Sequence, residues 1–240
     1  MSAGSPAARG AMSGYKDKLK VFAHGALDPV VRGLVAAGVK PDHLTILGLV
    51  LSVGAGFAFA IGRFRGAALV TCFAGLCDIL DGQVARHGGG ESKFGAFFDS
   101  TLDRVAEAAV LVGIAWFYLF NLVDMAMNPQ RVLVNLQRGL EPVTWAVIAL
   151  LAVLAMVGAF MVSYTRARAE GLGIDCKVGW FERPERMVLL IIMGFLGLGP
   201  AIPAGLLVLV VFSFATALQR MTHVWKRTRP PGPDIDSTEA

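Results

Sequence analysis

Long apolar runs separated by short polar connections occupy most of this chain. The runs lie near residues 43–62, 66–87, 94–120, 142–167, 184–199 and 203–225. Most of them approach the ~20 consecutive apolar residues that a helix needs to cross a bilayer. The pattern therefore predicts an all-α, polytopic membrane protein, with six transmembrane helices in one domain over residues 41–226.

A shorter amphipathic pattern precedes the first of these runs. Its apolar residues recur at the helical period, at Leu27, Val30, Val31, Leu34 and Val35. Basic residues lie close by, at Lys16, Lys18, Lys20 and Arg32. We therefore expect residues 15–40 to form an amphipathic helix on an anionic membrane face, with Asp28 as N-cap and Gly38 at its end.

The composition agrees with a membrane protein. Hydrophobic residues make up 55% of the chain and the mean hydropathy is +0.61, which is too apolar for an ordinary soluble domain. We expect the lipid bilayer to be its surroundings and expect no nucleic-acid partner. The polar residues 1–14 and the proline-containing residues 227–240 are predicted to be disordered tails.

The basic residues predict the orientation in the membrane. The connections on one side contain only Arg63, Arg65, Arg131 and Arg138, whereas most other lysines and arginines fall on the side of both termini. Basic residues accumulate on the cytoplasmic side of membrane proteins. Both termini are therefore predicted to be cytoplasmic, in the cell (inner) membrane.

Four aspartates interrupt the second and third apolar runs. Asp78 and Asp81 are three residues apart and Asp99 and Asp103 four apart, so each pair shares one face of a helix. Ionised side chains inside membrane segments are costly and usually functional. A hairpin through residues 87–92 would bring the pairs together, on the cytoplasmic side, as an all-oxygen site that suits a divalent cation.

Residues between the aspartates fit such a site. Gly82 and Gly95 lack a Cβ and leave room for a ligand or a neighbouring backbone. Arg86, one turn beyond Gly82, can hold a phosphate through two hydrogen bonds. The alternative is a structural network of ion pairs with Arg86, Lys93 and Arg104, which would not explain the two glycines or the depth of Asp78.

The segment from Asp78 to Asp103 resembles a known family signature. It reads D-x-x-D-G-x-x-A-R, then eight residues, then G-x-x-x-D-x-x-x-D. This arrangement resembles the signature of the CDP-alcohol phosphatidyltransferases, and every specified position is filled. The six-helix pattern and the amphipathic N-terminal segment are also similar, so the resemblance covers most of residues 15–226.

The resemblance implies a site for two divalent ions, Mg²⁺ or Mn²⁺. Asp78, Asp81 and Asp99 would be ligands, and Asp103 would be both a ligand and the general base. The donor would be a CDP-linked lipid, typically CDP-diacylglycerol, and the products would include CMP. The family also implies a homodimer, which a small-residue face at Gly48, Ser52 and Gly56 would weakly support.

Further positions match family residues that contact the donor nucleotide and pyrophosphate. They are Gly82, Arg86 and Ser92, together with Asp42 and Thr45 just before or within the first apolar run. A simpler interpretation exists for Asp42 and Thr45, because both residue types are common helix N-caps.

Arginines at the cytoplasmic ends of the last three predicted helices suggest where the acceptor binds. The arginines at these ends are Arg166, Arg168, Arg183, Arg186 and Arg220, and a basic pocket beside a metal site suggests an acceptor that itself carries a phosphate. The alternative is that arginines gather at cytoplasmic ends for topological reasons alone.

The segments 163–170 and 181–186 resemble the inositol-phosphate-transferring branch of the family, the phosphatidylinositol phosphate and archaetidylinositol phosphate synthases. That resemblance implies Ser163, Arg166, Arg186 and Arg220 as acceptor-binding residues and inositol phosphate as acceptor. Arg166 stands where the bacterial enzymes have lysine, so glycerol 3-phosphate is the alternative acceptor.

A divalent-cation channel or transporter is the competing function of another class. It predicts polar residues that continue across the membrane. The far halves of the second and third apolar runs, residues 66–77 and 108–120, are almost wholly apolar. The sequence therefore favours an enzyme that takes part in phospholipid biosynthesis.

Overall fold

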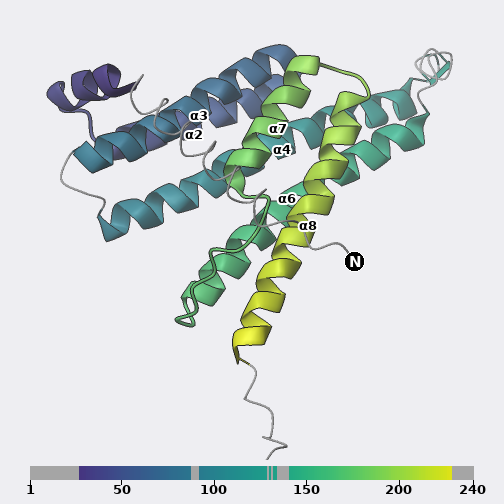
Figure 1. Ribbon diagram of the computed structural model, residues 1–240. Coiled ribbons are helices and arrows are strands. Elements are labelled where there is room, and N and C mark those ends of the chain that lie inside the picture. Colours follow the sequence, from purple (N-terminus) through teal and green to yellow (C-terminus); the bar gives the residue numbers. More distant parts are fainter. Residues whose placement is uncertain (1–26, 88–91, 129, 131, 134–140, 229–240) are drawn as a thin grey trace, which may run out of the picture. The chain divides into compact units, whose positions relative to one another are not determined.

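The computed structural model describes residues 27–87, 92–128, 130, 132–133 and 141–228, and within these ranges it is helical without strands. The predicted tail 1–14, part of the predicted N-terminal helix and residues 229–240 lie outside the described residues. The helices labelled in Figure 1 are α2 (Pro41–Ala60), α3 (Phe64–His87), α4 (Lys93–Met127), α6 (Pro142–Glu170), α7 (Arg183–Leu196) and α8 (Ala201–Thr228). The all-α prediction is confirmed.

Five of these helices are long and apolar enough to cross a membrane. They are α2, α3, α4, α6 and α8, as is typical of an integral membrane protein. The predicted span at 184–199 corresponds to α7, which has 14 residues and is shorter than a bilayer crossing needs. It ends at Leu196 because Gly197 adopts a φ of 81°, which breaks the helix.

The chain divides into two compact units. The first comprises Met1–Val50 and Phe73–Asp103, and the second comprises Leu51–Cys72 and Arg104–Ala240. Three long helices, α2, α3 and α4, contribute residues to both units.

The first unit contains a helix over residues 27–36 and a small apolar core. Val31 is fully buried there against Leu44, Leu80 and Val84. The predicted apolar face is only partly correct, because Val30 stays exposed while Val31 packs inward. The helical residues therefore use part of their apolar face for contacts within the chain.

The structure agrees with the sequence prediction at one end of this N-terminal helix and disagrees at the other. The N-cap prediction for Asp28 is wrong, because residues 27 and 28 are already helical. Asp28 instead pairs with Arg32 at 2.6 Å, and its carboxylate lies 3.4 Å from His87 Nε2. The predicted stop is confirmed: Gly38 has a φ of 73°, and Val39 N–H donates to the Leu34 carbonyl at 3.0 Å.

The second unit holds most of the apolar core. The α6 and α8 helices lie side by side, as Figure 1 shows. The α2 and α4 helices cross where Gly56 meets Gly113, since a Cβ on Gly113 would overlap the Gly56 carbonyl. Gly56, from the predicted small-residue face, therefore serves packing within the chain.

Candidate active site

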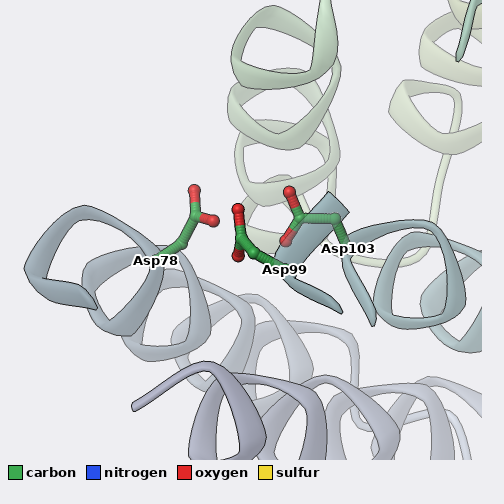
Figure 2. Close-up of side chains that lie close together, drawn as sticks. All are labelled: Asp78, Asp99 and Asp103. Carbon is green, nitrogen blue, oxygen red and sulfur yellow. The ribbon is translucent and has the colours of Figure 1, made fainter. Parts of the chain in front are cut away.

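Three of the four aspartates meet in the first unit. Asp78 comes from α3, and Asp99 and Asp103 come from successive turns of α4. One carboxylate oxygen of each lies within 4.8 Å of those of the other two. Figure 2 shows the three side chains directed toward one another. The predicted hairpin thus brings carboxylates from both helices into one cluster.

Asp81 is placed differently from the other three. Its side chain is buried, and its Oδ2 accepts a hydrogen bond from Thr45 Oγ1 at 2.9 Å. Residues three apart lie only about 60° from each other around a helix, so Asp81 and Asp78 share a face of α3. The hydrogen bond from Thr45 holds the Asp81 carboxylate toward α2, and Asp81 is not one of the three clustered carboxylates.

A pocket of about 270 Å³ in the first unit joins these aspartates to the predicted donor residues. Its walls come from α2, α3 and the start of α4. The lining residues are Lys40, Pro41, Asp42, Thr45, Asp78, Asp81, Gly82, Ala85, Ser92, Gly95 and Asp99. Four of the five predicted donor-binding residues thus share one pocket with three of the predicted metal ligands.

The structure contradicts the simpler interpretation of Asp42 and Thr45. The α2 helix begins at Pro41, so both residues lie within its first turns and neither is the N-cap. The Thr45 hydroxyl contacts the Pro41 carbonyl at 3.2 Å as well as Asp81. Thr45 therefore fixes a carboxylate at the pocket wall.

Ser92 has a local structural role beside its place in the pocket. It directly precedes α4, and its Oγ accepts the Gly95 N–H at 2.9 Å, as an N-cap serine does. A Cβ on Gly95 would come within 3.0 Å of that oxygen. Gly95 therefore preserves the turn that holds Ser92 at the pocket.

Arg86 lies at the edge of the same region. A Cβ on Gly82 would meet the Arg86 guanidinium at 3.6 Å, so the arginine extends over Gly82 on the surface of α3. The Arg86 side chain is exposed and does not line the pocket. Of the predicted donor residues, it is the one that the described pocket leaves outside.

The three predicted acceptor arginines gather in the second unit. Arg220 is buried, donates to the carbonyls of Val178 and Val162 at 2.8 and 2.6 Å, and donates to Glu182 Oε1 at 2.9 Å. Arg166 Nη1 lies 3.8 Å from that same oxygen. Ser163 is half-buried on α6, beside the Val162 carbonyl that Arg220 contacts.

Arg186 has a separate partner. Its guanidinium forms a buried, two-fold pair with Glu107, with Nε–Oε1 at 2.6 Å and Nη2–Oε2 at 2.8 Å. Sequence reasoning did not single out Glu107 or Glu182. The signal for Glu107 was an acid one helical turn after Asp103 within an apolar run. Glu182 had no comparable signal, because it lies in a connection between helices.

The three-carboxylate cluster suits a hard divalent cation. Ionised carboxylates this close repel one another, and a cation would turn that repulsion into attraction. The donor set is oxygen only, which excludes soft metals that prefer thiolates. The described cysteines, Cys72, Cys77 and Cys176, are free and take no part in this cluster.

Comparison with known proteins gives relatives over most of the chain. The phosphatidylinositol phosphate synthase of Mycobacterium bovis is 35% identical over 204 residues, which cover 82% of this chain and 84% of the relative. The archaetidylinositol phosphate synthase of Methanothermobacter thermautotrophicus is 31% identical over 206 residues, covering 85% and 90%.

Solved structures are also similar. The crystal structure of Mycobacterium tuberculosis phosphatidylinositol phosphate synthase with CDP-DAG bound has a TM-score of 0.69 at 30% identity, covering 85% of this chain and 97% of that chain. The same enzyme in complex with manganese and citrate has a TM-score of 0.68 at 30% identity, covering 85% and 92%. The model of the CDP-alcohol phosphatidyltransferase family matches residues 39–224. This chain is therefore an enzyme that belongs to the CDP-alcohol phosphatidyltransferase family.

Proposed function

We propose that this enzyme transfers the phosphatidyl group of CDP-diacylglycerol to a hydroxyl of an inositol phosphate and releases CMP. The observation that carries the proposal is the cluster of Asp78, Asp99 and Asp103 at the edge of a pocket lined by Thr45 and Gly82. Such a pocket joins a cation site to space for a nucleotide. Both curated relatives are named as synthases of inositol phosphate lipids.

We propose that two divalent ions, Mg²⁺ or Mn²⁺, bind at the aspartates. Asp78, Asp99 and Asp103 would supply the central ligands, and Asp81 would approach from the pocket wall. The manganese complex of the M. tuberculosis enzyme supports a divalent metal in such proteins. When bound, the ions would neutralise the pyrophosphate of the donor and the charge on departing CMP.

Asp103 is the proposed general base. Its carboxylate takes the proton from the acceptor hydroxyl as that oxygen forms its bond to the donor phosphorus and the bond to CMP breaks. Asp78 and Asp99 hold their side of the cluster in place. No protein nucleophile is needed, and positioning and electrostatics supply most of the rate.

The pocket walls would orient the donor. Gly82 leaves its face of α3 open, and Ser92 is fixed by its bond to Gly95. Arg86 is proposed to close over the pyrophosphate from outside the pocket, because an exposed guanidinium can hold a phosphate through two hydrogen bonds. Asp42 and Thr45 line the α2 side.

The acceptor's phosphate is proposed to bind at Arg166 and Arg220, with Ser163 nearby. Arg186 would support these two arginines from its buried position. The arginine cluster supports a phosphorylated acceptor. Glycerol 3-phosphate is the alternative, because it offers the same phosphate group and Arg166 departs from the lysine of the bacterial enzymes.

The membrane arrangement completes the proposal. We infer that α7 joins the five long helices as a sixth membrane segment, that residues 15–40 lie along the membrane surface, and that the protein is a homodimer. The basic residues support a cytoplasmic active site in the cell membrane.

The direct test uses purified enzyme in detergent with radiolabelled CDP-diacylglycerol. Inositol phosphate, glycerol 3-phosphate and serine are supplied in parallel, with Mg²⁺, with Mn²⁺ or with excess EDTA. We expect CMP release with inositol phosphate, no release in EDTA, and recovery when either ion is restored. Preference for glycerol 3-phosphate would contradict the acceptor, and turnover in EDTA would contradict the metal site.

A further inference from the structure

Each of the three arginines proposed for the acceptor already contacts a carboxylate of the chain. Arg186 pairs with Glu107 at 2.6 Å, Arg166 with Glu170 at 2.9 Å, and Arg220 with Glu182 at 2.9 Å. Three positive charges thus face three negative charges in the second unit. A phosphate that binds these arginines would therefore compete with carboxylates already in contact with them.

Glu107 is the partner least able to leave. Its side chain is 5% exposed and contacts Arg186 through both oxygens, at 2.6 and 2.8 Å. Separating such a pair leaves two charges buried without compensation. The Arg186–Glu107 pair is therefore a fixed support.

Glu170 is accessible, and among the described residues its ion pair is with Arg166. The two residues lie one turn apart on α6, and both side chains are about half-exposed. Exposed pairs of this kind contribute little to stability. Because both residues lie on α6, release of Arg166 by Glu170 would not create a phosphate-binding position between two helices.

Glu182 occupies the place between two arginines. Its Oε1 lies 2.9 Å from Arg220 Nη2 on α8 and 3.8 Å from Arg166 Nη1 on α6. One carboxylate oxygen therefore stands where a phosphate oxygen would bridge the two guanidinium groups. The Glu182 side chain is 44% exposed, so it can turn into solvent.

The local backbone gives Glu182 other partners. It is the N-cap of α7, where its side chain accepts the Glu185 backbone N–H. Glu185 in turn accepts the Glu182 backbone N–H at 3.2 Å, which forms a reciprocal capping box. Release of Arg220 therefore leaves the Glu182 carboxylate with a hydrogen-bond donor.

We propose that Glu182 is a built-in competitor for the acceptor's phosphate. Its carboxylate holds the place between Arg166 and Arg220 until the acceptor binds, and the phosphate then displaces it. This proposal rests on the proposed function of the same arginines. A phosphate monoester carries a charge of about −1.5 to −2 and outcompetes one carboxylate, whereas singly charged anions have little advantage over it. Glu182 thereby selects acceptors that carry a phosphate monoester.

The test uses two variants of full-length enzyme. Glu182→Gln removes the charge at constant size. Glu182→Asp keeps a preferred N-cap residue and draws the carboxylate back by one methylene. We expect each to lower the KM for inositol phosphate by about 1.5-fold to fivefold and to strengthen competitive inhibition by inorganic phosphate in parallel, as the magnitude of a partly exposed ion pair implies. The KM for CDP-diacylglycerol should stay within error.

Asp175→Asn is the matched control, since it removes a carboxylate from the same connection, where Asp175 faces Lys177 at 3.7 Å. It should leave both constants unchanged. A KM for inositol phosphate that rises or stays constant in folded Glu182→Gln or Glu182→Asp enzyme would overturn the competition. Wild-type enzyme that releases no CMP with any phosphorylated acceptor would instead overturn the proposed function itself.

Discussion

Thr45 and Asp81 are joined across two helices: the Thr45 hydroxyl on α2 donates to the Asp81 carboxylate on α3 at 2.9 Å. Both side chains are buried, at 8% and 6% exposure. The bond gives a buried carboxylate a donor and fixes the α2 wall of the pocket. It also explains why Asp81 stands apart from the other three aspartates.

Replacing Thr45 with valine keeps the side-chain shape and removes this donor. A hydrogen bond to a charged group is worth ~1.5–3 kcal/mol, so we expect a loss of about that size in the free energy of unfolding. The KM for CDP-diacylglycerol should rise as well. Thermal unfolding and donor titration measure the two effects.

Thr45→Ser is the matched control, because it restores the hydroxyl and should recover most of the donor affinity. Equal donor KM values for Thr45→Val and wild type would show that the pocket does not depend on this bond.

Replacing Asp103 with asparagine tests the general base. The loss of a positioned base lowers rates by about 10²–10⁴, so CMP release should fall by at least about a hundredfold. Binding of Mn²⁺, followed by electron paramagnetic resonance, should weaken but persist, because Asp78 and Asp99 remain in the cluster.

Asp78→Asn separates the two roles of the cluster, because it removes a proposed ligand from α3 and leaves the base in place. It should weaken Mn²⁺ binding. Asp124→Asn, later on α4, is the control for charge removal and should retain activity. Unchanged turnover in Asp103→Asn enzyme would remove Asp103 as the base.

The Arg186–Glu107 pair allows a double-mutant test. Loss of one partner from a buried pair costs ~3–5 kcal/mol, so Glu107→Leu and Arg186→Met should each be strongly destabilised. The double variant should recover much of the stability, because no unpaired charge remains buried. Chemical or thermal unfolding of all four proteins gives the coupling.

Acceptor kinetics of the double variant then separate two roles for Arg186. A folded double variant with a normal KM for inositol phosphate would show that Arg186 only supports the other acceptor arginines and does not itself bind the acceptor. A raised KM would show that it also binds the acceptor.

The crossing of α2 and α4 predicts a sharp difference between two glycines. Gly113→Ala places a Cβ against the Gly56 carbonyl, so the helices must move apart and the protein should lose more than about 1 kcal/mol. Gly54→Ala meets nothing within 4 Å and should be neutral or stabilising by up to ~1 kcal/mol, because alanine favours the helix. The unfolding temperatures of the two variants test this difference. Equal values would contradict the close contact between α2 and α4 at Gly56 and Gly113.

The sequence alone determined the helical class and the aspartate spacing. Apolar runs predict helices because backbone groups must be satisfied inside a membrane, and the residues 94–120 and 142–167 accordingly lie within α4 and α6. The period of the helix placed Asp99 and Asp103 on one face, and the structure brings both to Asp78. Both features depend only on the types and the spacing of residues within a single helix.

The tertiary structure decided which polar groups meet. The sequence could not show that Asp81 turns to Thr45, or that Arg186 pairs with Glu107, because these partners are 36 and 79 residues apart. The prediction for Asp28 was also wrong, because Pro29 is tolerated in the first turn of a helix and does not by itself mark the first helical residue. Pairing across helices depends on crossing geometry and on side-chain rotation, which periodicity leaves undetermined; only packing fixes which carboxylate faces a cation, a hydroxyl or an arginine.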